Sequence, residues 1–150
     1  MRVQLSRMDG ILKDLRKNKK VLMDALSSDF TFAPSHDIEG DCGTTLALQF
    51  DTAEEAVAFT EKVSFNTTIP INTGKHIYKH WTPIMEKRGA LHPKMDPFKM
   101  EANRDILPDY KDDMCPVTLD KLAKVVYISV DPDDTKELLD EKIEILKNSL

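Results

Sequence analysis

Two short apolar stretches, "TTLALQF" at 44–50 and "VVYISV" at 125–130, constrain the fold of this 150-residue chain more than any other feature. Their β-branched content and partial alternation predict strands of one small sheet. Shorter extended segments are expected near 30–32 and at 66–71. The segments between them have the apolar period of helices, except for a long irregular stretch. The sequence therefore predicts one α/β (α+β) domain over residues 1–150, with a small mixed or antiparallel sheet flanked by helices.

An apolar stripe predicts a helix over residues 1–26. Its members recur at helical spacing and are interrupted only by Lys19: Leu5, Met8, Leu12, Leu15, Leu22 and Leu26. The opposite face, "KDLRKNKK", is interpreted as the solvated side of the helix rather than a basic binding patch. No capping residue precedes the stripe, so we expect this helix to continue from chain upstream.

Two further helices are predicted from capping signals. Asp51 and Glu54 form a capping-box-like pair before a helix that ends near Val63, with Ala53, Ala56, Val57 and Val63 expected to face the core. Thr135 is expected to cap a final helix, with an apolar face of Leu139, Ile143, Leu146 and Leu150.

Residues 88–116 are predicted to lack long regular elements, because four prolines interrupt them. A loop of this length in a compact domain is usually functional or disordered. We expect it to be ordered, held to the domain by apolar anchors at Leu91, Met95, Phe98, Met100 and Ile106.

Composition excludes several classes of function. The formal net charge of −5 argues against nucleic-acid binding, which requires a basic surface. No apolar run approaches the roughly 20 residues of a membrane span, and no signal peptide is visible. We therefore expect a cytoplasmic protein in which Cys42 and Cys115 are reduced, half-buried thiols.

The segment "NTGKHIYKHW", residues 72–81, concentrates the side chains best suited to chemistry. His76 and His80 would share one face of a helix, but a metal site would need a third ligand from another loop. We therefore predict no metal site. Two interpretations remain equal on the pattern alone. In the first, Asn72, His76, Tyr78, His80 and Trp81 form the wall of a ligand pocket. In the second, the aromatic residues anchor the loop and the histidines are merely exposed.

Three stretches resemble the C-terminal part of the DegT/DnrJ/StrS sugar aminotransferases. "LRKNKKVLMDAL" (15–26) is similar to the helix that leads out of that family's large domain. "CPVTLDKLAKVVYISVDPDDTKELLDEKIEILKNSL" (115–150) is similar to its closing segment. "INTGKHIYKHW" (71–81) lies where the family has a His- and aromatic-containing segment that reaches toward the substrate. The likeness spans nearly the whole chain and is strongest at its end.

The resemblance implies a pyridoxal-phosphate enzyme of the aspartate-aminotransferase fold. Such an enzyme moves an amino group from an amino acid to a ketosugar or nucleotide sugar in surface-polysaccharide biosynthesis. This chain would be its C-terminal small domain, residues 1–26 the remainder of the interdomain helix, and the complete protein a homodimer. The cofactor and the catalytic residues would belong to an N-terminal large domain. Residues 72–81 would contact the sugar.

The middle segment departs from the family pattern. A Pro-x-His-like motif is usual there, whereas Trp81 and Thr82 follow His80, so either histidine could take the substrate-facing place. Lys75 and Lys79 are not assigned as the Schiff-base lysine, because that lysine works only beside a phosphate cup and an acidic partner. The alternative is a free-standing small-molecule-binding or regulatory module, which should bury the stripe of its first helix.

Overall fold

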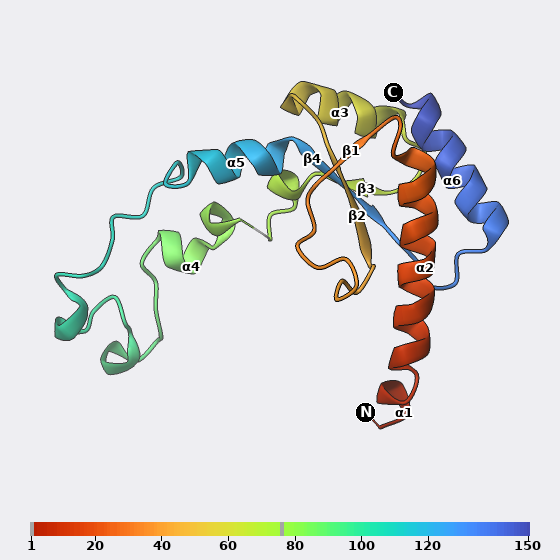
Figure 1. Ribbon diagram of the computed structural model, residues 1–150. Coiled ribbons are helices and arrows are strands. Elements are labelled where there is room, and N and C mark those ends of the chain that lie inside the picture. Colours follow the sequence, from red (N-terminus) through yellow and green to blue (C-terminus); the bar gives the residue numbers. More distant parts are fainter. Residues whose placement is uncertain (1, 76) are drawn as a thin grey trace.

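The computed structural model describes residues 2–75 and 77–150 (Figure 1). Four strands form one sheet: β1 (Thr31–Phe32), β2 (Thr45–Gln49), β3 (Thr67–Thr68) and β4 (Val125–Ser129). Their order is β1-β2-β4-β3, and every neighbouring pair is antiparallel. The predicted fold class is thus confirmed, with the antiparallel alternative realised.

Helices account for much of the remaining chain. The α-helices are α1 (Arg2–Leu5), α2 (Met8–Leu26), α3 (Ala53–Lys62), α4 (Thr82–Met85), α5 (Pro116–Ala123) and α6 (Lys136–Asn148). Short 3-10 turns are η1 (Pro70–Asn72), η2 (Tyr78–His80), η3 (Pro93–Met95) and η4 (Glu101–Asn103). In the described part of the chain, no helix has the length and apolar composition that crossing a membrane requires.

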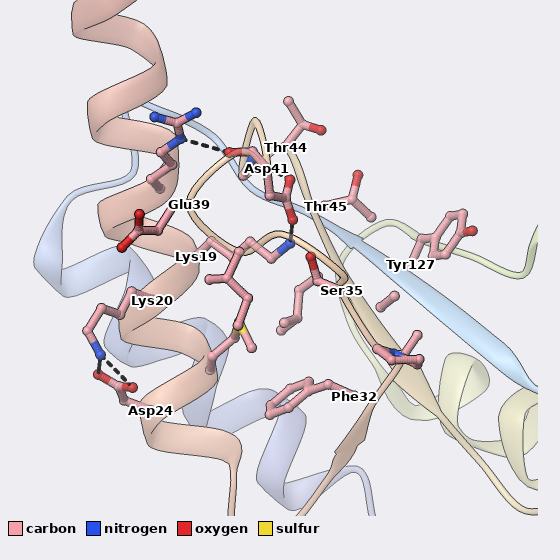
Figure 2. A pocket seen from close by; sticks show the side chains of 18 residues that line it. Lys19, Lys20, Asp24, Phe32, Ser35, Glu39, Asp41, Thr44, Thr45 and Tyr127 are labelled. Atoms are coloured by element: carbon pink, nitrogen blue, oxygen red, sulfur yellow. Dashed lines mark hydrogen bonds and ion pairs between the residues drawn. The ribbon is translucent and has the colours of Figure 1, made fainter.

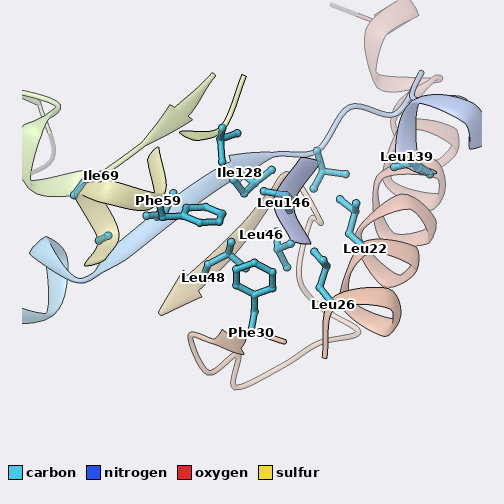
Figure 3. Packing of buried hydrophobic residues seen from close by; sticks show 14 of the residues in the cluster. Leu22, Leu26, Phe30, Leu46, Leu48, Phe59, Ile69, Ile128, Leu139 and Leu146 are labelled. Atoms are coloured by element: carbon cyan, nitrogen blue, oxygen red, sulfur yellow. The ribbon is translucent and has the colours of Figure 1, made fainter. Parts of the chain in front are cut away.

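The core lies on one face of the sheet, under α2, α3 and α6 (Figure 3). The inward residues of the two long strands pair directly across the ladder, Leu46 with Ile128 and Leu48 with Val126. Helices contribute Leu15, Leu22, Leu26, Ala56, Phe59, Leu139 and Leu146. Full burial of one such large side chain stabilises the fold by about 1.5–3 kcal/mol.

Three details of the predicted helices were wrong. The cap of α3 is Thr52, not Asp51: the Thr52 hydroxyl accepts a hydrogen bond from the Glu55 amide, which lies 3.1 Å away. Ala56 and Phe59, three residues apart, form the buried face of α3, whereas Val57 lies off that face and is 41% exposed. At the chain end, Leu150 lies beyond α6 and is 57% exposed. The Thr135 cap of α6 is confirmed, because its side chain accepts from the Leu138 amide.

The predicted first helix is divided and only partly buried. A turn at residues 6–7 separates α1 from α2. Leu15, Leu22 and Leu26 enter the core, but Leu5 is 61% and Met8 44% exposed. These two residues lie where α1 and the first turn of α2 extend past the sheet (Figure 1). The apolar stripe thus continues beyond the surface that covers it.

Residues 82–114, here called the arm, project from the body of the domain (Figure 1). Most of the apolar side chains expected to anchor this loop are instead exposed: Leu91, Met95, Met100 and Ile106. The arm runs outward from the body of the domain, away from the core that was expected to bury them (Figure 1). Phe98 is the exception and packs edge-on against Tyr110, with ring centroids 6.4 Å apart.

Candidate functional site

The predicted site segment forms the junction between the sheet and the arm. Asn72 ends η1 and is exposed, while Tyr78 and His80 lie in η2 and are half-buried. Trp81 follows η2 and is 52% exposed. His76, the fifth predicted residue, lies outside the described residues. The four described residues therefore lie on, or directly after, the two short turns η1 and η2 that precede the arm.

Tyr78 fixes the arm at its exit as well as at its entry. Its hydroxyl donates a hydrogen bond to the carbonyl oxygen of Asp112, which lies 2.7 Å away. The hydroxyl oxygen of Tyr78 also accepts a hydrogen bond from the backbone N–H of Cys115 at 3.3 Å. A single side chain thus joins the two ends of the projecting segment, the role that the anchoring interpretation assigns to it.

Unlike Tyr78, Trp81 keeps an exposed ring surface and His80 keeps a ring nitrogen without a hydrogen-bond partner among the described residues. The indole N–H of Trp81 donates to the carbonyl oxygen of Lys75 at 3.2 Å, which fixes the ring while half of its surface stays exposed. The Nδ1 atom of His80 is buried and has no hydrogen-bond partner among the described residues. An unsatisfied buried polar atom costs about 1–3 kcal/mol, so this ring is held at a cost to stability.

Two pockets of the described residues are lined by other parts of the chain and not by this segment. Nor do those residues place three or more His, Cys, Asp or Glu side chains together in a way that could hold a metal ion. Lys75 is exposed and Lys79 half-buried, and neither lines these two pockets.

A pocket lies elsewhere, between α2, the loop 33–44 and the outward face of β2 and β4 (Figure 2). We call it the α2 trough; its volume is about 1080 Å³. Its outward strand residues are Thr45, Ala47 and Tyr127, which alternate with the core residues of the same strands. Sequence analysis missed this trough, although small and aromatic residues on the outward face of two adjacent strands were its signal.

Ion pairs fix the loop that forms one wall of the trough. The Asp41 carboxylate accepts a hydrogen bond from the Gly43 amide at 2.8 Å and forms an ion pair with Lys19. The Nε atom of Arg16 donates to the carbonyl oxygen of Asp41 at 2.7 Å. The Gly43 amide, followed by the Lys19 ammonium, lowers the pKa of the Asp41 carboxyl below its usual range.

Gly43 allows this loop to approach the helix closely. Its φ is +78°, and a Cβ at this position would lie 2.9 Å from the backbone nitrogen of Arg16. No other residue type adopts this conformation at so short a distance without strain. The wall of the trough thus depends on one glycine and one carboxylate.

Cys42 and Cys115, expected to be half-buried, are both exposed thiols. Each belongs to a segment that crosses the surface, Cys42 beside Gly43 and Cys115 before α5. Neither lies close to the core that would have buried it.

No family model matches the sequence, and no curated protein matches it at a significant level.

Proposed function

We propose that this chain is the C-terminal small domain of a pyridoxal-phosphate sugar aminotransferase of the DegT/DnrJ/StrS type. The complete cytoplasmic enzyme, a homodimer with an N-terminal large domain, would transfer an amino group from an amino acid to a ketosugar or nucleotide sugar. The reaction would serve surface-polysaccharide biosynthesis. Support comes from the resemblance at residues 15–26, 71–81 and 115–150, and from the distribution of apolar surface.

The observation that best supports this proposal is that two groups of apolar side chains are left exposed by the described residues. Leu5 and Met8 stand exposed at the projecting end of α1 and α2. The arm adds Leu91, Met95 and Ile106, each at least 69% exposed. Soluble proteins seldom leave large apolar patches in water unless these bind something. A free-standing module should have buried the first stripe, whereas a small domain would cover both surfaces with its large domain and second subunit.

In this proposal the chain contributes orientation rather than bond-making. Pyridoxal phosphate, held by the large domain, would supply the electron sink for amino transfer. The exposed face of Trp81 suits the C–H surface of a sugar, and the amide of Asn72 supplies a donor and an acceptor. The small domain would then close over the substrate and exclude water.

The test uses the complete enzyme with Trp81→Ala and Trp81→Phe. We expect Trp81→Ala to raise KM for the sugar and Trp81→Phe to raise it much less. The visible absorption of the bound cofactor should stay unchanged in both variants. Equal loss of sugar use and cofactor binding would contradict a pocket role for Trp81.

A second candidate, the free-standing binding module, is favoured by one observation. The α2 trough is formed entirely by residues of this chain and needs no other domain to complete its described walls. The two candidates differ in whether cells contain these residues within a longer polypeptide.

A further inference from the structure

We propose that the α2 trough is a binding site for an uncharged amphipathic ring compound, with a flat apolar body and hydroxyl groups at its edge. The inference does not depend on the aminotransferase proposal. It uses none of residues 72–81, and its test has a different readout.

The lining of the trough is mainly apolar, and the volume of the trough exceeds what a packing defect would leave. Met23 comes from α2, Phe32 from β1, Ala47 from β2, and Ile38 from the loop 33–44. With about 1080 Å³, the trough is as large as the cavities that usually hold ligands of drug size, roughly 300–1,000 Å³. Such a lining favours a ligand with an apolar body.

The charges of the trough cancel, which argues against an ionised ligand. Three cations, Arg16, Lys19 and Lys20, face three anions, Asp24, Glu39 and Asp41. Lys19 pairs with Asp41, and Lys20 donates to both carboxylate oxygens of Asp24, at 2.9 and 2.7 Å. Side-chain exposure at the Lys19–Asp41 pair is only 17% and 29%. A charged ligand would have to compete with a partly buried pair, whereas a neutral ligand leaves it intact.

Hydroxyl groups supply the polar contacts. Ser35 and Thr44 lie on the loop, Thr45 on β2 and Tyr127 on β4 (Figure 2). Figure 2 draws no hydrogen bond from any of them to another residue of the lining. Each hydroxyl both donates and accepts, and this dual capacity matches the hydroxyl groups of a neutral ring compound.

The loop 33–44 has the form of a cover fixed at both ends. The Ala33 amide donates to the Ala47 carbonyl at 2.9 Å, and Asp41 is fixed to α2 as described above. Between these points, the Gly40 amide bonds only locally, to Asp37 Oδ1 at 2.8 Å. Ile38 is 67% exposed on this turn and is the residue placed to cover an apolar ligand.

The test is a titration of the ¹⁵N-labelled 150-residue chain with 4-nitrophenyl β-D-glucopyranoside, an uncharged ring compound with an apolar face and hydroxyl groups. We expect saturable shifts at the backbone amides of residues 32–33, 35–47 and 127, and no saturable shift with 4-nitrophenyl phosphate. Ala47→Leu, which fills the trough, should weaken binding by about tenfold or more. Ala90→Leu, the same change on the arm, should leave it unchanged.

Thr45→Val keeps the shape of the strand residue and removes one hydroxyl, so it should weaken binding even if Ala47→Leu fails to fold. The proposal is overturned by an absence of saturable shifts, by shifts confined to the arm or to Trp81, or by equal binding of the phosphate. The two proposals can fail separately, because Trp81→Ala should not alter this titration.

Discussion

The hydroxyl of Tyr78 lies 2.7 Å from the carbonyl oxygen of Asp112 and so closes the arm at its base. Tyr78→Phe removes this bond and the one accepted from the Cys115 amide. We expect the free energy of unfolding to fall by about 0.5–1.5 kcal/mol, because both bonds are partly exposed to water. Cleavage of residues 82–114 by a protease should accelerate.

Tyr110→Phe is the matched control on the same arm, since the Tyr110 ring packs on Phe98 and keeps that contact without its hydroxyl. If both variants accelerate cleavage equally, Tyr78 is not what holds the arm.

His80 is expected to reduce the stability of the chain while serving function. Its buried Nδ1 has no partner among the described residues, so His80→Leu removes an unsatisfied polar atom. We expect the free energy of unfolding to stay equal or to rise by up to about 1 kcal/mol. Urea denaturation measures this change. A loss of more than about 1 kcal/mol would indicate that the histidine is satisfied in solution.

Gly43 and Gly10 should respond in opposite ways to alanine. Gly43→Ala forces a Cβ against the backbone of α2 at positive φ, so we expect a loss of about 1–3 kcal/mol and a displaced loop 33–44. Gly10→Ala lies in α2 with open space around it and should stabilise the chain by about 0.5–1 kcal/mol. Thermal denaturation of both variants tests the close approach, and a harmless Gly43→Ala would contradict it.

Asn18 holds the turn before α6 against α2. It is 4% exposed, and its Nδ2 donates to the Asp131 carbonyl oxygen at 2.9 Å. Asn18→Ala leaves that carbonyl without its donor, and we expect a loss of about 1–3 kcal/mol. Asn148→Ala, at the exposed end of α6, is the control and should change stability by less than about 0.5 kcal/mol. Equal effects at the two positions would contradict the assigned role.

Asp41 makes the docking of the loop dependent on pH. Its pKa is lower in the folded chain than the usual value near 3.8, so the carboxylate stabilises the fold above that pH. The contribution is lost as pH falls through the lowered folded pKa. The stability difference between the chain and Asp41→Asn should be about 0.5–1 kcal/mol at pH 6 and should vanish in strong acid. A stability difference between the chain and Asp41→Asn that grows below pH 4 would contradict this prediction.

The strands and the main helices could be predicted because their apolar periods are local. The stripe of Leu15, Leu22 and Leu26 and the inward residues of β2 and β4 are visible in the sequence and form the core. What remained hidden depends on contacts between distant segments. Asn18 and Lys19 belong to a run that reads as solvated, yet one is buried against Asp131 and the other pairs with Asp41.

The sequence identified the candidate segment, but it did not indicate how the neighbouring residues lie on the surface. Tyr78, His80 and Trp81 lie directly before the arm, yet the sequence could not indicate that the arm projects and exposes Leu91 and Ile106. Whether apolar loop residues pack inward depends on the neighbouring surface, which the local pattern does not contain. The α2 trough was missed for the same reason, since its walls come from α2, a loop and two strands.

The most direct test of the aminotransferase proposal is the size of the native polypeptide in source cells, measured by immunoblot with an antibody against this chain. The proposal predicts a band more than twice the 17.1 kDa of these residues, because a large domain must carry the cofactor lysine. A band at 17.1 kDa would contradict it and favour the binding module.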